Sequence, residues 1–397
     1  MRPVSNWIPP VGNPDGEGRD GAGGATPPPP PPAPDARVQP RYGELAPEGW
    51  VPPQPNAPGW TPPPPPGLIP LRPLGLGDVL AASFKVMRRN PKPTYGFAVV
   101  YGVITAVILG GLSAFATQEL LARVTFASTA AMQDIASGTV VGAVVLFIVT
   151  VLAGYALGAV PQGIIALEVA RGTIGDKSTL RSLWDGAKGR IWALVGWFLL
   201  IAVVGTVYAG IIITVGLTPL LTGSGGVQDV LGAIGLVVLL GLLGVVPAVW
   251  IGTKLAYVPA VLIVERATLG RAIARSWVLT DQRFWRTFGT LLLLTLMLNV
   301  AISIVTMPIQ LIASLFLGIV APTGTEESLL WGALVVGTVV EVVSTVFVAV
   351  ATVALAAAPT LLYIDARIRK EGLDVVLQHA AEERAAGRDP GDPYATR

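Results

Sequence analysis

Long intervals without charged residues constrain this chain more than any other feature. They cover residues 93–118, 135–167, 191–228, 230–264 with Lys254 inside, 287–325, and 328–364 with Glu341 inside. A bilayer core of about 30 Å is crossed by roughly 20 helical residues, so each interval accommodates one membrane-spanning helix. Charged residues make up 13% of the chain, whereas soluble domains carry about 25%. The sequence therefore predicts an all-α fold, a polytopic transmembrane helical bundle with six spans.

Lysine and arginine are distributed unequally around these spans. Segments 72–92, 171–190, 266–286 and 367–370 each hold several of them, whereas the three alternate loops together hold one, Arg123. Loops on the cytoplasmic side carry the excess of positive residues. We therefore expect both termini in the cytoplasm. The N-terminal residues lack the apolar segment of a signal peptide, so we expect no cleavable signal peptide. We expect the first span to direct insertion into the membrane.

A short amphipathic helix is expected before each pair of spans. In the third, Leu269, Ile273 and Trp277 share one face, and Arg271 and Arg275 lie opposite. A helix with arginine on its polar face and tryptophan on the other lies in the plane of the membrane surface. The stretches GDVLAASFKVMRRNP and STLRSLWDGAKGR show the same pattern. We call these three segments elbows, and each is expected to open a hairpin of two spans.

The second helix of each hairpin ends in a similar way. The stretches PQGIIALEVAR, PAVLIVER and PTLLYIDAR begin at Pro161, Pro259 and Pro359, roughly 100 residues apart. Three copies of one elbow-plus-hairpin unit explain this spacing, although positive-inside sorting alone could impose similar loops. The predicted division is a disordered proline-rich tail (1–73), three repeat units (74–170, 171–266 and 267–370) and a C-terminal tail (371–397).

The N-terminal tail contains most of the 35 prolines and few aliphatic residues. Such a segment cannot bury enough apolar surface to offset its ordering entropy, so we expect disorder with polyproline II stretches. Within it, GWVPPQP and GWTPPPP begin at Gly49 and Gly59. They are either ligands for the aromatic-lined groove of a protein partner or parts of a solvated spacer.

Three acidic residues occupy equivalent places near the cytoplasmic helix ends, where the helix macrodipole opposes a negative charge. A cation is therefore expected beside each one. The expected structural ion pairs involve Glu168, Arg171, Glu265, Arg266, Asp365 and Arg367, with the elbow arginines as further partners. The alternative is that these acids bind a substrate.

The remaining basic elbow residues are candidates for contact with anionic lipid headgroups. They are Arg88, Arg89, Arg181, Lys188, Arg271 and Arg275. Lys254 and Glu341 are intramembrane charges, and such groups are functional candidates. Each either reaches the interface, as long side chains do by snorkelling, or lines a polar pathway.

The sequence contains few candidates for catalytic residues. It has no cysteine and one histidine, His379, in the C-terminal tail. Hydrolytic sites in membranes need a base beside a nucleophile, paired deep aspartates or a metal cluster, and no phosphate-binding loop follows a strand. We therefore expect no catalytic residue, no metal, no cofactor and no nucleic-acid partner.

Three stretches resemble a known family. They are RPLGLGDVLAASFKVMRRNPKPTYG, ERATLGRAIARSWVLTDQRFWRTFG and LLYIDARIRKEGLDVVLQHAAEERA. Over about residues 70–385 the chain resembles the membrane domain of glycerophosphoryl diester phosphodiesterase, found in many high-GC Gram-positive bacteria. The resemblance implies a multi-pass protein of the bacterial plasma membrane. In relatives with the enzymatic domain, cleavage belongs to a separate soluble barrel with catalytic histidines, which we do not expect here.

Two functions follow as hypotheses. The first is a non-enzymatic scaffold or accessory protein whose basic elbows hold anionic lipid and whose proline-rich arm recruits a partner. The second is a transporter or flippase-like pathway, because internal repeats are common in transporters. A continuous polar cavity touching Lys254 or Glu341 would favour transport, and a fully packed bundle would favour the scaffold.

Overall fold

The structure of the protein is a computed structural model that describes residues 67–125, 132–223, 226–320, 326–388 and 391–394. The chain divides into two units, Met1–Trp60 and Thr61–Arg397, and all described residues belong to the second. The predicted disorder of the tail and its two tryptophan motifs lie outside the described residues. Leu68 and Ile69, which the prediction assigned to the tail, are buried. Their apolar side chains begin the packed unit before residue 73.

The described residues form helices and no strands. They are α1 (Leu76–Arg89), the π-helix η1 (Lys92–Gly96), α2 (Phe97–Thr125), α3 (Met132–Thr173), α4 (Leu180–Gly216), α5 (Thr218–Thr222), α6 (Val227–Lys254), α7 (Val258–Val264), α8 (Leu269–Thr280), α9 (Phe284–Val320), α10 (Glu326–Glu371) and α11 (Leu373–Ala385). Six stretches are long and apolar enough to cross a membrane: Lys92–Phe115, Val141–Thr173, Leu180–Leu220, Val227–Val264, Phe284–Leu315 and Leu334–Glu371. The predicted all-α, six-span fold is confirmed.

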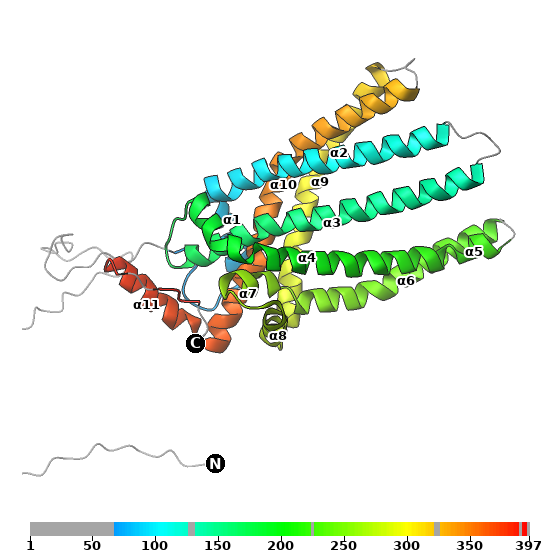
Figure 1. Ribbon diagram of the computed structural model, residues 1–397. Coiled ribbons are helices and arrows are strands. Elements are labelled where there is room, and N and C mark those ends of the chain that lie inside the picture. The colour runs from blue at the N-terminus through cyan, green and yellow to red at the C-terminus, as the bar shows by residue number, and fades with distance from the viewer. Residues whose placement is uncertain (1–66, 126–131, 224–225, 321–325, 389–390, 395–397) are drawn as a thin grey trace, which may run out of the picture. The chain divides into compact units, whose positions relative to one another are not determined.

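The long helices pack side by side, and α10 has the most neighbours among them. Helix α3 packs against α2 and α4, and α4 packs against α6 (Figure 1). Helix α10 contacts α1, α2, α3 and α9. The last span of the sequence therefore holds the first hairpin and the third elbow-plus-hairpin unit together.

The core lies at one end of the spans. We call this the elbow end; it comprises α1, η1, α7, α8, the first turns of α4 and α9, and the last turns of α3 and α10. The three stretches that follow the recurrent prolines meet here, because α7 contacts both α3 and α10. Ile164, Leu262 and Ile364, one from each stretch, have no exposed surface. The similar sequences thus form one shared core.

The three prolines act differently on their helices. Pro161 and Pro359 lie inside the continuous helices α3 and α10. Pro259 instead lies in the first turn of α7, after a break that follows Lys254. Proline lacks an N–H group, which a first helical turn does not need. The fourth span, expected to continue to residue 264, is therefore α6 and α7 joined by a turn.

The three elbows also differ. Helices α1 and α8 are separate amphipathic helices, but the second elbow and the third span form one helix, α4. Helix α1 ends before Pro91, and α8 ends before Gln282, which has a positive φ of 64°. The corresponding stretch of α4, DGAKGRI, has no proline, so the helix runs on.

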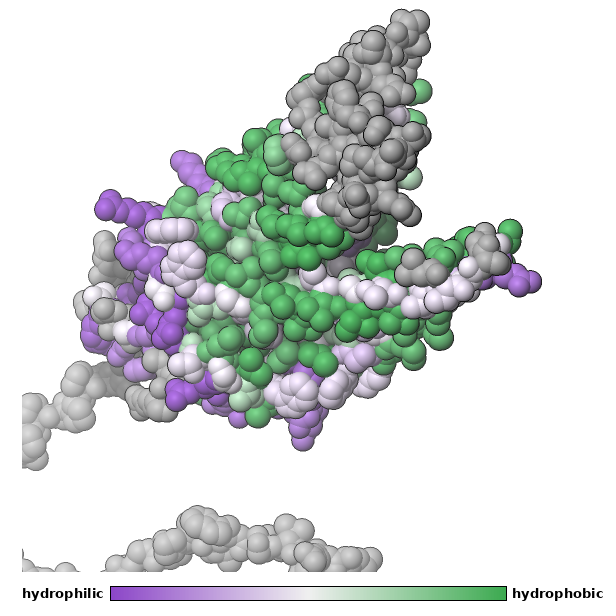
Figure 2. Space-filling view, turned by 45° about the vertical axis from the view of Figure 1, so that its right-hand side comes forward, coloured by the Kyte–Doolittle hydropathy of each residue, from purple (hydrophilic) through white to green (hydrophobic). Residues whose placement is uncertain are grey.

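Away from the elbow end, the spans expose apolar side chains. We call this part the far half: residues 100–115, 141–158, 200–220, 227–250, 292–315 and 334–348. Leu242, Val246 and Ile304 are 64%, 72% and 69% exposed. Figure 2 shows apolar surface over the spans and hydrophilic residues gathered mostly at the elbow end. Lipid tails are the solvent that such a surface fits.

Candidate functional site

The carboxylate of Glu265 is at the centre of the elbow end. It follows α7, and its side chain is 1% exposed. It accepts hydrogen bonds from Arg275 Nε at 2.6 Å and from the Tyr363 hydroxyl, and Arg367 Nη1 lies at 3.5 Å. Glu265 therefore joins α7 to α8 and α10.

A second carboxylate completes this network. Glu371 accepts from Arg275 Nη2 at 2.9 Å and from Arg367 Nε at 2.7 Å. Burial alone lowers the pKa of Arg275, but its hydrogen bond to Glu265 and the charges of Glu265 and Glu371 raise it above its ordinary value. Two arginines thus face two carboxylates, and the network is neutral.

The surroundings of Asp365 are different. Its side chain, 3% exposed, accepts from the Leu74 amide at 2.8 Å and from Arg369 Nε at 2.8 Å. Arg283 Nη1 and Arg286 Nη2 lie at 3.3 and 3.4 Å from its other oxygen. The Leu74 carbonyl accepts from Arg369 and Arg286. One acid thus ties the chain before α1 to the start of α9 and the end of α10.

Glu168 has no such partners. It is buried, and its Oε1 accepts from Asn90 Nδ2 at 3.0 Å. Within the described residues its Oε2 has no hydrogen-bond partner. Arg171, the expected cation, points to the hydroxyls of Ser178 and Ser182 instead, at 3.5 and 3.2 Å.

The arginine that most closely follows Glu265 or Asp365 in the sequence is not the one that pairs with that acid in the structure. Arg266 is exposed with a positive φ of 54°, and Arg367 approaches Glu265 instead of Asp365. Residues one or two positions apart do not face each other on a helix or turn. The partners come from other elements, or from four positions along α10, as with Asp365 and Arg369.

The six expected headgroup residues fall into two groups. Arg88, Arg181 and Arg271 are exposed, and no carboxylate of the described residues pairs with them. The other three have protein partners: Arg89 donates to the Gly172 carbonyl, Lys188 to Asp185 and Arg275 to Glu265.

Lys254 reaches the elbow end. Its Nζ lies 3.2 Å from Asp281 Oδ1 and 5.4 Å from the centre of the Trp277 ring. The hydrogen bond and charge of Lys254 lower the pKa of Asp281. This is the geometry of a long side chain that extends towards the interface.

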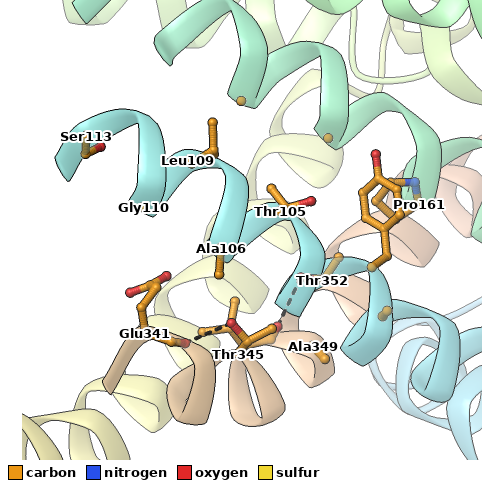
Figure 3. A pocket seen from close by; sticks show the side chains of 16 residues that line it. Thr105, Ala106, Leu109, Gly110, Ser113, Pro161, Glu341, Thr345, Ala349 and Thr352 are labelled. Carbon is orange, nitrogen blue, oxygen red and sulfur yellow. Dashed lines mark hydrogen bonds between the residues drawn. The ribbon is translucent and has the colours of Figure 1, made fainter. Parts of the chain in front are cut away.

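Glu341 lies far from Lys254, at the edge of a groove of about 500 Å³ between α2, α3 and α10 (Figure 3). Small and hydroxyl-bearing residues line much of it, and the buried Thr105 hydroxyl has no partner within the described residues. The Thr345 hydroxyl donates to the Glu341 backbone carbonyl at 2.9 Å. Towards the elbow end the lining reaches the buried Ala98 and Ala349. The groove therefore ends against the core.

A second groove, of about 540 Å³, is almost entirely apolar. Trp197, Phe198, Ile251 and Leu355 are among its lining residues. Its polar residue Gln162 donates to the Ala356 carbonyl at 3.3 Å. In the described part of the chain, no group of three or more His, Cys, Asp or Glu side chains could hold a metal ion.

Several contacts escaped the sequence reasoning. Glu371 and Arg369 lie four positions from Arg367 and Asp365, a spacing that could have identified both pairs. Tyr394 gives no such signal: its hydroxyl bonds to Thr173 Oγ1 and to the Ala170 carbonyl from the far end of the chain. The C-terminal tail thus packs against α3.

Comparisons with known proteins bear on the part of the chain that holds Glu265 and Asp365. No curated protein and no solved structure matches the chain. A family described as the membrane domain of glycerophosphoryl diester phosphodiesterase matches residues 226–384. The matched segment contains Glu265, Asp365 and the arginines around them. Over these residues the chain is similar to that family, as its sequence motifs predicted.

Proposed function

We propose that this integral membrane protein is a non-enzymatic scaffold or accessory protein that gathers anionic lipid around its elbow end. The acids of the Glu265 and Asp365 networks already have arginine partners, which supports a structural role for them. The proposal therefore rests on the surface of the elbows.

The observation that carries it is the pairing of exposed arginines with partly exposed tryptophans on the elbows. Arg181 and Arg271 are exposed, and Trp184 and Trp277 on the same helices are 45% and 38% exposed. Tryptophan favours the membrane–water interface, and each basic residue near an anionic surface contributes about 1 kcal/mol of attraction. The elbows fit a surface of anionic headgroups.

The proposed orientation places the elbow end and both termini in the cytoplasm of a bacterial cell. The excess of lysine and arginine in the elbow segments supports it, and anionic lipid concentrates in the cytoplasmic leaflet. Reporter fusions after residues 176 and 280 should give cytoplasmic signals, and a fusion after residue 224 the opposite signal. A cytoplasmic signal at residue 224 would contradict this orientation.

Two further parts of the proposal concern the arm and the repeats. The proline-rich arm recruits a protein partner, which affinity purification with and without residues 1–66 tests by comparing the proteins retained. The three elbow-plus-hairpin units are copies of one ancestral unit. The meeting of their proline-containing stretches in one core supports this origin.

The lipid proposal is tested with two triple variants of equal charge change. The first replaces Arg88, Arg181 and Arg271 with Gln, and the control replaces Arg72, Lys188 and Arg384, which pair with Asp78, Asp185 and Asp176. Native mass spectrometry from mixed phosphatidylglycerol and phosphatidylcholine counts the bound lipids. The first variant should lose anionic enrichment and the control should keep it. Equal enrichment in both variants would contradict the proposal.

The groove at Glu341 favours a second candidate, a transport pathway. Its hydroxyl lining and carboxylate are features of a polar site between spans. Because the chain has no cysteine, a single Thr105→Cys substitution reports access without ambiguity. Labelling by a membrane-impermeant maleimide from each side of the membrane, in turn, supports transport. Labelling from one side alone, or from neither, removes this candidate.

A further inference from the structure

We propose that Arg283, Arg286 and Arg369 form a discrete binding site for the phosphate group of a membrane lipid. We call these residues the arginine triad. The inference rests on the proposed function, which places anionic lipid at the elbow end, and it adds a site and a chemical class. The triad was not among the residues expected from the sequence to contact headgroups.

The triad carries more positive charge than its surroundings balance. Its guanidinium groups share one carboxylate, Asp365. Other acids at the elbow end are engaged: Asp78 pairs with Arg72, and Glu371 pairs with Arg275 and Arg367. Within the described residues, Asp365 is the triad's one carboxylate partner. Among the described residues, two of the three positive charges of the triad are therefore left without a carboxylate counter-charge.

Asp365 cannot use the remaining N–H groups of the triad. Its oxygens already receive the Leu74 amide and three arginines. Among the described residues, Arg283 bonds through Nη1 and Arg286 through Nη2, which leaves further N–H groups on both. The side chains are 23%, 34% and 27% exposed for Arg283, Arg286 and Arg369. Planar arginine donors match the oxygens of a phosphate.

The electrostatics of Arg283 point in the same direction. Burial lowers its pKa, the charge of Asp365 opposes this effect, and the charges of Arg369 and Arg286 lower the pKa further. Arginine nevertheless stays protonated at neutral pH. A bound anion would offset the mutual repulsion of the triad.

The position of the triad indicates a lipid as the source of the phosphate. Trp285, between Arg283 and Arg286, is 78% exposed and begins the span Phe284–Leu315. Tryptophan at the start of a span lies at headgroup depth. Leu293 and Met297, roughly two and three turns beyond Arg286 on the same face of α9, are 42% and 41% exposed. They offer an apolar path for an acyl chain below the phosphate.

The test uses the full-length protein and counts retained lipid by native mass spectrometry during titration with phosphatidylglycerol. Wild type should retain one lipid that survives delipidation conditions. The double variant Arg283→Gln/Arg286→Gln should bind it at least tenfold more weakly. The triple elbow variant at Arg88, Arg181 and Arg271 should keep this one lipid while it loses the general enrichment.

The outcomes separate the inference from the proposed function. Undiminished retention in the double variant overturns the triad site, whereas undiminished enrichment in the triple variant overturns only the elbow proposal. If the double variant unfolds, Arg283→Lys/Arg286→Lys keeps both charges and loses the planar donors. It should also weaken retention, and unchanged retention in it overturns the site.

A second arm distinguishes lipid from soluble phosphate. Inorganic phosphate and glycerol phosphate are added to the wild-type protein carrying the retained lipid. Neither should displace the lipid at millimolar concentration, because neither supplies an acyl chain for the α9 surface. Displacement by either one overturns the lipid as the source and assigns the site to a free phosphate.

Discussion

The elbow end and the far half of the spans are built for different solvents. At the elbow end, Leu262 and Ile364 are fully buried and Glu265 is held by hydrogen bonds from two other helices. In the far half, the side chains of Val246 and Ile304 are 72% and 69% exposed. The first region is stabilised as a water-soluble core is, and the second depends on lipid to cover its apolar faces. Buried charged side chains such as Glu265 therefore lie at the elbow end, where other helices of the protein supply their hydrogen-bond partners.

The break between α6 and α7 illustrates this division. A helix break frees backbone groups, which a bilayer cannot satisfy. Here the Ser276 hydroxyl accepts from the Tyr257 amide at 3.2 Å and donates to the Lys254 carbonyl at 2.8 Å. The Thr280 hydroxyl donates to the same carbonyl. The break is tolerated because α8 covers it.

The largest difference in stability between the elbow end and the far half is expected when one acid in each region is neutralised. Glu265→Gln leaves Arg275 and Arg367 without their buried carboxylate, so we expect a loss of about 3–5 kcal/mol in the free energy of unfolding. Glu341→Gln removes the same charge from an exposed position and should change stability little. Thermal unfolding in detergent measures both. Equal losses would show that the two halves are not distinct.

A pair of leucines sharpens the contrast without charge. Leu262→Ala creates a cavity in the shared core and should cost about 2–5 kcal/mol. Leu242 is 64% exposed on α6, and Leu242→Ala should cost less than about 0.5 kcal/mol. Denaturant titration of both variants gives the two values. A large loss at Leu242 would mean that the far half is packed by protein.

The docked C-terminal tail extends the elbow end and makes it sensitive to alkali. Burial raises the pKa of Tyr394 above its ordinary value. Its hydroxyl stays neutral in the folded protein while the unfolded chain ionises, so its contribution is present below about pH 10 and is lost as pH rises further. Tyr394→Phe should cost about 1 kcal/mol at pH 8, and this difference from wild type should shrink as pH increases. A constant difference between pH 8 and pH 11 would contradict the buried position.

The smallest effect is expected at the surface of α8. Lys254 lowers the pKa of Asp281, so their pairing favours folding above the ordinary range of an aspartate and fades as pH falls. Asp281→Asn should reduce the melting temperature slightly at pH 7, and this reduction should shrink as pH falls below about 4. A large loss at pH 7 would place this pair in the core instead.

The sequence predicted the features that depend on local pattern. Charge-free length identified the six spans, and the spacing of Leu269, Ile273 and Trp277 identified the third elbow. Contacts between distant residues were beyond it: the Leu74 amide and Asp365 are 291 positions apart. Arg283 and Arg286 contributed only to the charge count, because nothing in their spacing shows that they face Asp365.

The most direct test of the two-solvent account is carbene labelling from within the bilayer. The unmodified protein in lipid vesicles is photolabelled with a membrane-partitioned diazirine, and the labelled residues are mapped by mass spectrometry. The account predicts labels at Leu242, Val246, Ile304 and Met307, which are 64%, 72%, 69% and 71% exposed. It predicts none in residues 257–264 and 360–368, which are buried throughout. Comparable labelling of both sets would contradict the claim that the elbow end is a protein core and the far half a lipid-facing surface.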